Sequence, residues 1–296
     1  MLGSIYALIA LGYTMVYGVL RFINFAHGDI YMVGAFIGLY SAQGLHLIQS
    51  QGDSMVLSTS ALLLILLISM IGSALLGFVI ERVAYKPLRR APRITALITA
   101  IGVSMLLEYG GQLVFGTTPR PYPTLAGAAQ GMTSSNTSGA VINRVDIVIL
   151  TVAAALVILL QFIVYRTKVG RAMRALSFDR ETASLMGINT DTIITLTFII
   201  GSAFAGAAGV LVGVRNPQID PLMGLSAGIK AFVAAVIGGI GSIPGAALGG
   251  LILGLSEEAV KAVYPPLAEV VVYGVLTLIL VLRPSGLLGG TTMEKV

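Results

Sequence analysis

The chain has 296 residues, of which 56% are hydrophobic and only 10% are charged, and it contains no cysteine. A soluble domain carries about 25% charged residues, so this composition predicts an all-α polytopic membrane protein. The lack of cysteine excludes disulfides, thiolate metal sites and cysteine nucleophiles. The net charge of +5 does not indicate nucleic-acid binding, because the basic residues cluster between apolar runs.

Apolar runs separated by polar or proline-containing segments predict the membrane spans. In chain order they are Leu2–Leu20, Ile30–Leu47, Ala61–Ile80, Ile94–Phe115, Val145–Tyr165, Thr190–Val214, Gly228–Ile240, Ala246–Val263 and Ala268–Leu282. About 20 apolar residues cross a bilayer as a helix. The runs at 228–263 are short and rich in glycine. We therefore expect nine crossings, or eight if one of these late segments is re-entrant, within a single domain covering 1–296. No basic segment precedes the first run, so no cleavable signal peptide is expected.

Two segments between spans, Glu81–Arg93 and Arg166–Asn189, carry five Lys/Arg each. The positive-inside rule places both in the cytoplasm, which is consistent because two crossings separate them. The N-terminus is then outside and the C-terminus inside. The cytoplasmic side also receives Arg21, Arg283 and Lys295. The longest loop, 116–144, is poor in charge and is expected outside the cell. Segment 49–60 is expected to be a polar turn.

The segment Arg166–Asn189 has the pattern of a short helix. Ser177 or Asp179 can cap its start and Gly187 can end it. The apolar side would consist of Leu176, Ala183, Leu185 and Met186. Such a helix could lie on lipid or dock into another protein, while the simpler interpretation is a basic cytoplasmic loop. Glu81–Arg93 contains Pro87 and Pro92 and is interpreted as a rigid basic connector.

Between the first two spans, the segment Asn24–Asp29 places an amide, an imidazole and a carboxylate within six residues, with Gly28 to relieve the backbone. One interpretation is a break that exposes backbone and side-chain polar groups to a path through the membrane. The other is a cytoplasmic turn in which Asp29 satisfies a helix dipole. Under the first interpretation the pathway residues are Asn24, Phe25, His27, Gly28 and Asp29.

Small residues recur at four-residue spacing in the later spans, which favours close helix packing. They are Gly201, Ala205, Gly209 and Gly213 in the sixth span, and Gly245 and Gly249, which lie just before and within the eighth.

The chain lacks the motifs of an enzyme. It contains no phosphate-binding loop, no H-E-x-x-H and no G-x-S-x-G. Glu108, Glu257 and Glu258 are scattered rather than grouped, and each is as readily a helix-end surface group as a site. We therefore expect a conduit with no catalytic residue, no metal and no cofactor. A stand-alone channel or secondary carrier for small polar solutes is an alternative, and an intramembrane enzyme is disfavoured.

Several long stretches resemble one family. They are INFAHGDIYMVGA (23–35), ERVAYKPLR (81–89), GRAMRA at 170 with ETASLMGINTDTIITLTFIIGSAFAGAAGVL ending at 211, IKAFVAAVIGGIGSIPGAALGGLILG (229–254), and RPSGLLG with MEKV at 283–296. Together they resemble the permeases of branched-chain amino acid ABC importers, and in particular the shorter of the two permease types. Related urea permeases share the His-Gly and GGIGS-type stretches, so a urea or amide permease of the same family is the alternative.

The resemblance implies an importer in a bacterial inner membrane, with alternating access driven by ATP. This chain would pair with a longer sister permease, two cytoplasmic ATPase subunits and an extracytoplasmic amino-acid-binding protein. The implied fold is similar to that of vitamin B12-type importer permeases. Segment 166–189 would be the coupling loop that contacts the ATPase, through Arg171, Arg174, Asp179, Glu181, Ala183, Leu185 and Gly187.

Overall fold

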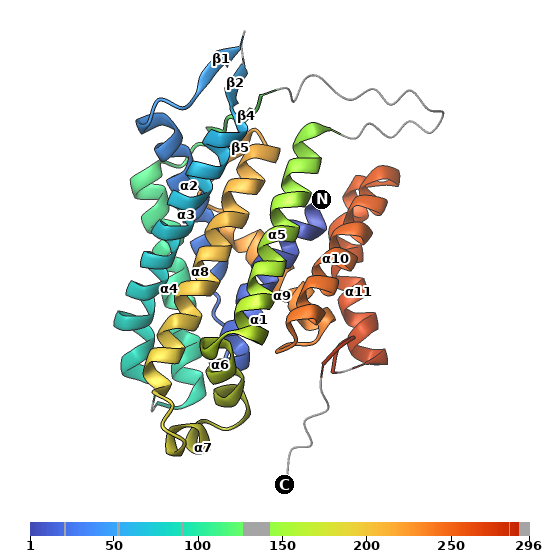
Figure 1. Ribbon diagram of the computed structural model, residues 1–296. Coiled ribbons are helices and arrows are strands. Elements are labelled where there is room, and N and C mark those ends of the chain that lie inside the picture. The colour runs from blue at the N-terminus through green and yellow to red at the C-terminus, as the bar shows by residue number, and fades with distance from the viewer. Residues whose placement is uncertain (21, 52–53, 90, 127–142, 284, 290–296) are drawn as a thin grey trace.

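The computed structural model describes residues 1–20, 22–51, 54–89, 91–126, 143–283 and 285–289, and the fold is mainly helical (Figure 1). The α-helices are α1 Leu2–Leu20, α2 His27–Gly44, α3 Thr59–Ile80, α4 Arg93–Phe115, α5 Arg144–Arg166, α6 Lys168–Phe178, α7 Arg180–Leu185, α8 Thr190–Arg215, α9 Met223–Gly238, α10 Ile243–Val263 and α11 Ala268–Leu282. Arg21, Arg90 and Lys295, which the topology prediction used, lie outside the described residues.

Seven helical segments in the described part of the chain are long and apolar enough to cross a membrane. They comprise α1, α3 with its extension to Leu88, α4, α5, α8, α10 and α11 with the short turn before it. The expected class, a multi-pass helical membrane protein, is confirmed. The other two expected spans are also helices. However, α9 has only 16 residues, and α2 contains His27 and Asp29 in its first turn.

Side-chain caps begin several of these helices where the sequence supplies a short polar residue. The Ser58 hydroxyl accepts a hydrogen bond from the Ala61 amide at 3.2 Å, before α3. Before α8, the Asn189 side-chain oxygen accepts a hydrogen bond from the Thr192 amide at 3.1 Å. Before α10, the Ser242 hydroxyl accepts one from the Gly245 amide at 3.2 Å. Each cap satisfies an amide that has no partner within its own helix.

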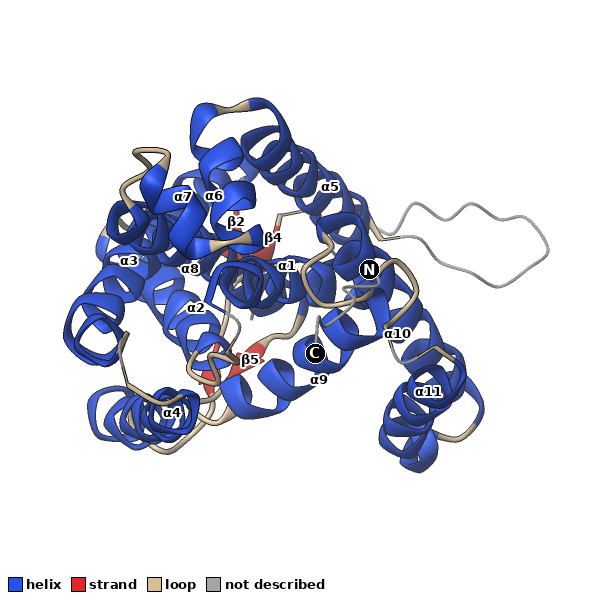
Figure 2. Ribbon diagram, turned by 90° about the horizontal axis from the view of Figure 1, so that it is seen from below, coloured by secondary structure: helices blue, strands red, loops and turns tan. Residues whose placement is uncertain are grey.

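The bundle surrounds α1 and α8. Both helices are buried along most of their length, α1 from Gly3 to Val16 and α8 from Gly201 to Val214 except Ala203. Viewed along the bundle, α1 lies near the centre, with α2, α8, α9 and α10 around it, and α4 and α11 lie at the periphery (Figure 2). Large apolar side chains of the peripheral helices, such as Leu113 and Val281, are exposed. They fit lipid or partner helices.

The end of the bundle where α5 begins carries short strands. Strand β1 (Gln49–Gln51) pairs antiparallel with β2 (Ser54–Leu57), and β2 pairs parallel with β4 (Thr124–Leu125). Strand β3 (Arg120–Pro121) pairs antiparallel with β5 (Gln218–Ile219). The expectation of a plain polar turn at 49–60 was therefore wrong. Loop 116–144 is tied to its neighbours through residues 120–125, and its residues 127–142 lie outside the described residues.

The third span was expected to end at Ile80, but most of the basic connector Glu81–Arg93 that follows it is helical. Helix α3 continues without interruption into a π-helical turn, η1 (Glu81–Tyr85), and a 3₁₀ turn, η2 (Lys86–Leu88). Pro87 is tolerated because it lies in the first turn of η2, where no intrahelical amide donor is needed. Glu81 and Tyr85 are buried against the bundle, so the helix continues because its inner face still has contacts to make.

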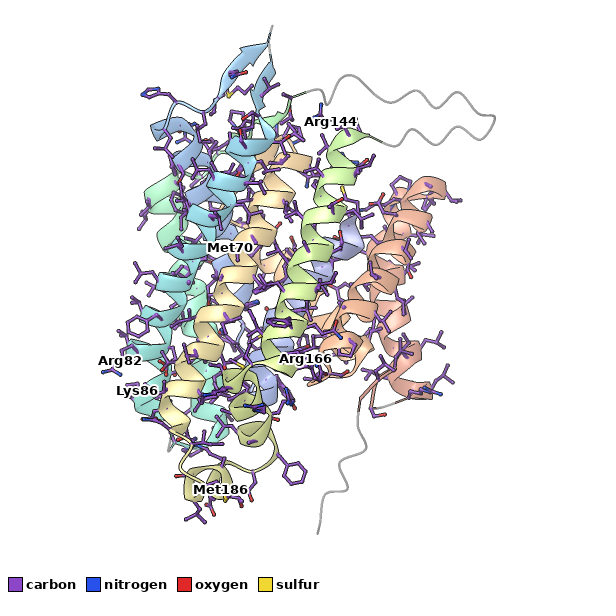
Figure 3. All side chains as sticks on the ribbon, in the orientation of Figure 1. Met70, Arg82, Lys86, Arg144, Arg166 and Met186 are labelled. Atoms are coloured by element: carbon purple, nitrogen blue, oxygen red, sulfur yellow. The ribbon has the colours of Figure 1, made fainter. Side chains whose placement is uncertain are left out.

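The two basic segments lie at the same end of the bundle. Arg82, Lys86 and Arg166 lie at the end opposite Arg144 (Figure 3). If both segments are cytoplasmic, they must lie at the same end of the bundle, as they do here. The orientation of the bundle in the membrane is a prediction.

Candidate functional site

The segment Asn24–Asp29 lies inside the bundle, not at its end. His27 is the first residue of α2, and its imidazole is buried. A Cβ added at Gly12 would lie 2.1 Å from His27 Nε2, and one at Gly201 would lie 3.8 Å from its Cε1. Gly12 is eight residues before the end of α1, or about 12 Å at 1.5 Å per residue. Helix α2 therefore starts at mid-depth, and residues 22–26 lead into the bundle as non-helical chain.

Gly28 allows two helix starts to meet. A Cβ at Gly28 would lie 2.4 Å from the Gly224 carbonyl oxygen and 2.8 Å from the Gly228 Cα, both on α9. The φ of Gly28 is not positive, so the expectation that this glycine relieves a strained backbone was wrong. Its function is close approach: any side chain here would separate the first turns of α2 and α9.

Polar atoms of this segment are buried, and only some of them have partners. The Asn24 side-chain oxygen accepts a hydrogen bond from the Tyr85 hydroxyl at 2.5 Å, and Asp29 Oδ2 accepts one from the Ser104 hydroxyl at 2.5 Å. Among the described residues, no partner exists for Asn24 Nδ2, His27 Nε2 or Asp29 Oδ1. Buried polar atoms are normally paired, so the segment has hydrogen-bonding capacity that the chain itself does not use. Phe25, in the same segment, is half-buried.

Helix α4 contributes a face to this region. Ala100, Ser104, Glu108 and Gly111 lie inward, at three- or four-residue spacing, and a Cβ at Gly111 would lie 3.1 Å from the Met32 side chain of α2. Glu108 lies within α4 and is buried, so it is not a surface group at a helix end. Of the other two scattered glutamates, Glu257 is buried, whereas Glu258 is exposed.

Glu257 of α10 has lysine partners at its buried position. Its Oε1 lies 2.8 Å from Lys230 Nζ of α9 and 2.8 Å from Lys261 Nζ of its own helix. A carboxylate inside a membrane bundle is tolerated when it is paired in this way, so this cluster links α9 to α10.

The small-residue positions meet neighbouring backbone. A Cβ at Gly209 would lie 2.3 Å from the Tyr31 carbonyl oxygen of α2, and one at Gly213 would lie 2.7 Å from the Tyr122 ring. On α10, a Cβ at Gly249 would lie 2.0 Å from the Ala234 carbonyl oxygen of α9. A Cβ at Gly245 would lie 2.3 Å from the Gly238 carbonyl oxygen of α9, and Ala205 is fully buried.

The segment 166–189 forms two helices where one was expected. Thr167 caps α6, and Asp179 caps α7 by accepting hydrogen bonds from the Glu181 and Thr182 amides at 2.8 and 3.1 Å. Ser177 lies within α6, and its hydroxyl donates to the Arg174 carbonyl. Gly187 has φ +83° and its amide donates to the Ser184 carbonyl, which ends α7. Of the two predicted caps, Asp179 is therefore the correct one. The prediction that Gly187 ends the helix is also confirmed.

Hydrogen bonds from Thr182, through its hydroxyl and its amide, hold the pKa of Asp179 below its ordinary value. These donors favour the ionised carboxylate.

The predicted apolar side of this segment divides into two. Leu176 and Ala183 point into the protein, with Ala183 only 4% exposed. Leu185 and Met186 point outward with 88% and 78% exposure, and Phe178 at the end of α6 is 88% exposed. Ala183 and Leu185 are two residues apart on α7, so they lie on opposite faces of this helix. Met186 marks the far tip of this segment in Figure 3.

The charged residues predicted to contact the ATPase differ in whether they touch the rest of the protein. The Arg174 guanidinium donates to the Val164 carbonyl and lies 5.3 Å from the Tyr165 ring centre, so it fastens α6 to the end of α5. Arg171 and Glu181 are exposed.

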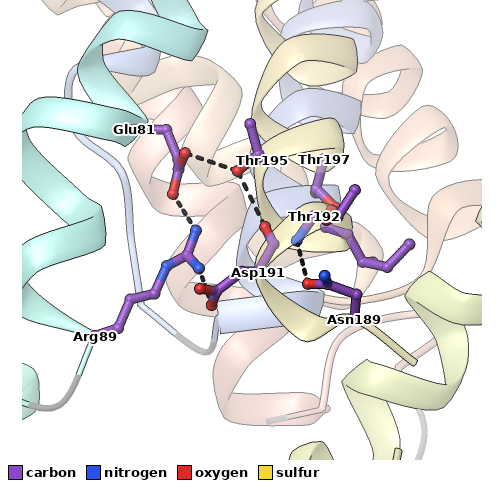
Figure 4. A network of polar contacts seen from close by, with 8 residues as sticks. Glu81, Arg89, Asn189, Asp191, Thr192, Thr195 and Thr197 are labelled. Carbon is purple, nitrogen blue, oxygen red and sulfur yellow. Dashed lines mark hydrogen bonds and ion pairs between the residues drawn. The ribbon is translucent and has the colours of Figure 1, made fainter. Parts of the chain in front are cut away.

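A buried polar network connects the end of α3 to the start of α8. Arg89 forms ion pairs with Glu81 and with Asp191, and the Thr195 hydroxyl donates to Glu81 Oε2 at 2.9 Å (Figure 4). Glu81 is fully buried and the Arg89 side chain is 7% exposed, whereas that of Asp191 is 52% exposed. The network joins residues that lie about a hundred positions apart in the chain, which the sequence could not indicate.

These features define a multi-pass helical membrane protein. Within the described residues it has unpaired polar atoms at the centre of its bundle and an exposed apolar tip at one end. The family model for the permease component of branched-chain amino acid transport systems matches residues 1–281. The chain belongs to this family, so it is a permease component and not an enzyme.

Curated relatives support the assignment. The chain is 44% identical to the high-affinity branched-chain amino acid transport system permease protein BraD of Pseudomonas aeruginosa, with 99% of this chain and 94% of BraD covered. It is 42% identical to the permease protein LivH of Escherichia coli K12, over 100% of this chain and 94% of LivH. It is 27% identical to LivM of the same organism, over 97% of this chain but only 68% of LivM. No solved structure matches the chain.

Proposed function

We propose that this chain is the permease subunit of an ATP-driven importer that carries branched-chain amino acids across a bacterial inner membrane. Its similarity to BraD and LivH over nearly the full length supports this proposal most strongly. The permease would function as a heterodimer with a longer sister subunit, since the longer LivM proteins are also relatives. Two cytoplasmic ATPases and an extracytoplasmic amino-acid-binding protein would complete the importer.

In this proposal all nine main helices cross or enter the membrane, with α2 and α9 starting at mid-depth. Discontinuous helices that start within a bundle are a recurrent way to present polar groups to a substrate. The fold would be related to that of vitamin B12-type importer permeases. The cytoplasmic face would be the end that carries α6 and α7.

The segment Asn24–Asp29 would border the substrate path. A branched-chain amino acid has an ammonium group, a carboxylate and an aliphatic side chain. The unpaired atoms of Asn24, His27 and Asp29 supply donors and acceptors for the charged groups, and the half-buried Phe25 supplies an apolar surface. Asn24→Ala and His27→Ala should reduce uptake while leaving assembly of the importer intact. Wild-type uptake by both variants would remove this segment from the path.

The α6–α7 tip would transmit ATP hydrolysis to the bundle. The exposed side chains Phe178, Leu185 and Met186 are the ones available to enter a groove on the ATPase, and Ala183 instead packs inside the permease. Helix α7 leads directly into α8, the buried helix with the small-residue stripe, so movement of the tip would reach the core.

The decisive experiment is reconstitution in liposomes. With the sister permease, the ATPases and the binding protein present, uptake of radiolabelled leucine should require ATP. Leu185→Asp should abolish coupled uptake, whereas Lys168→Asp, at an exposed position near the start of α6, should not. Passage of leucine through this chain without ATPases would indicate a channel or secondary carrier. Transport of urea in place of leucine would favour the amide-permease alternative.

A further inference from the structure

A polar groove opens beside the α6–α7 tip. It is a cavity of about 650 Å³ between η2 on one side and α7 with the start of α8 on the other. Lys86 and Arg89 line the first side, and Arg180, Ser184, Asn189 and Asp191 line the second. Its two sides come from segments that are about a hundred residues apart and that the Arg89–Asp191 ion pair holds together.

The groove has an uncompensated positive charge. Arg89 is shared between two carboxylates, Glu81 and Asp191, so these three residues carry a net charge of −1. Lys86 and Arg180 add two positive charges, and neither has an ion-pair partner within the described ranges of the chain. The site therefore has a net charge of +1, which a single carboxylate would neutralise.

The groove is fixed in shape before any partner arrives. The Arg89 side chain is buried and held at both ends of its guanidinium. The Asn189 side chain is held by its cap on α8, and Gly187 fixes the turn that leads to it. Among the charged groups that line the groove in the described chain, only the ammonium of Lys86 and the guanidinium of Arg180 are left to close on a ligand, which lowers the entropy cost of binding.

We infer that this groove receives an acidic side chain, Asp or Glu, of the ATPase subunit. The inference rests on the proposed function. The groove adjoins α7, which ends at the exposed Leu185, and the next residue, Met186, is also exposed and lies at the tip of the same end (Figure 3). A partner that covers the tip therefore also covers the groove. The apolar tip would provide contact area, and the groove would provide a charged pair that sets the orientation of the partner.

The lining argues for a protein carboxylate over a lipid headgroup. Ile188 and Pro87 are the only apolar residues that line the groove in the described chain, and the remainder are charged or polar residues or Gly187. An acyl chain would find little apolar surface there, whereas an Asp or Glu on a protein surface requires none.

The test uses the two permeases held in nanodiscs and titrated with the ATPase subunit. Lys86→Glu with Arg180→Glu should weaken ATPase binding by about fivefold or more, because an exposed ion pair contributes up to about fivefold and the reversed charges also repel. Added salt should reduce the difference from wild type. The matched control is Arg82→Glu with Lys168→Glu, which makes the same charge change on exposed residues of this end that do not line the groove.

Zero-length crosslinking with a carbodiimide gives a second measurement. The reagent joins the Lys86 ammonium to a carboxylate as an amide and leaves as a urea. In wild type it should link Lys86 to one Asp or Glu of the ATPase, and the Lys86→Glu variant should lose this product.

The inference is overturned if the groove variant and the control variant bind the ATPase equally well, or if both lose the same amount. It is also overturned if the loss occurs only in nanodiscs that contain anionic lipid, since the ligand would then be a headgroup. Failure of the proposed function is distinguishable, because wild-type permease would then not bind the ATPase at all and Leu185→Asp would have no binding to disrupt.

Discussion

His27 occupies the space that any side chain at position 12 would need: a Cβ on Gly12 would lie 2.1 Å from His27 Nε2. Gly12→Ala should therefore force α1 and α2 apart. Overpacking of a well-packed core typically costs about 1–3 kcal/mol. We expect a lower melting temperature in detergent and reduced leucine uptake in the reconstituted importer.

The double variant Gly12→Ala with His27→Ala distinguishes a steric cause from others. Removing the imidazole relieves the clash, so the double variant should be more stable than the sum of the two single variants predicts. Gly102→Ala on α4 is the control, since a Cβ there has no neighbour within 4 Å. Additive effects in the double variant would show that Gly12 is required for a different reason.

The ion pairs of Arg89 differ in importance because their carboxylates differ in burial. Glu81 is fully buried, whereas Asp191 is half exposed. Arg89→Gln leaves a buried carboxylate without a cation, a loss that typically costs about 3–5 kcal/mol. Asp191→Asn should be mild, at about 1 kcal/mol or less. Thermal unfolding in detergent measures both.

A paired substitution checks the charge argument. Glu81→Gln with Arg89→Gln removes both buried charges, so it should recover much of the stability that Arg89→Gln loses. Equal destabilisation by the double and single variants would mean that the shape of the Arg89 side chain matters more than its charge.

The spans and the limits of α7 could be predicted because their causes are local in sequence. A run of apolar residues determines a membrane helix. Asp179 followed three residues later by Thr182, and Gly187 after the last helical turn, determine a short helix without reference to the rest of the chain. Helix α6 was missed because the expected helix began only at Ser177 or Asp179, whereas a further cap at Thr167 begins α6.

The central site could be predicted only in part. The polar residues Asn24, His27 and Asp29 were visible in the sequence, but their depth was not. That depth depends on Gly12 and Gly201, which make room for His27, and on Gly224, which makes room for α2 itself. The burial of Glu81 could not be predicted for a similar reason: a carboxylate in a basic segment suggests a surface, and only the contacts with Arg89 and Thr195 explain its burial.

The membrane orientation can be measured directly because the chain has no cysteine. Single cysteines at Arg82 and Leu185 should react with a membrane-impermeant maleimide only from the cytoplasmic side, and one at Arg144 only from outside. All three positions are exposed, and Arg82 lies at the end opposite Arg144 (Figure 3). Labelling of Arg82→Cys in intact cells would reverse the proposed orientation.

The cap on α7 should make the tip sensitive to acid. The folded-state pKa of Asp179 lies below its ordinary value because Thr182 donates to the carboxylate, and the unfolded value is about 3.9. The stabilisation of α7 by the ionised cap is therefore fully present above about pH 4. It is lost as the pH falls through the lower folded-state pKa. A spin label on Met186→Cys should be restrained at neutral pH and become mobile in this acidic range.

Thr182→Val tests the cause of the shift. Valine has nearly the same shape but no hydroxyl, so the first of the donors that depress the pKa of Asp179 is removed. The pKa should rise toward its ordinary value, and the midpoint at which the spin label becomes mobile should move to higher pH. Asp179→Asn keeps a capping oxygen but cannot titrate, so its spin-label signal should be nearly independent of pH. An unchanged midpoint in Thr182→Val would assign the acid sensitivity of the tip to a group other than Asp179.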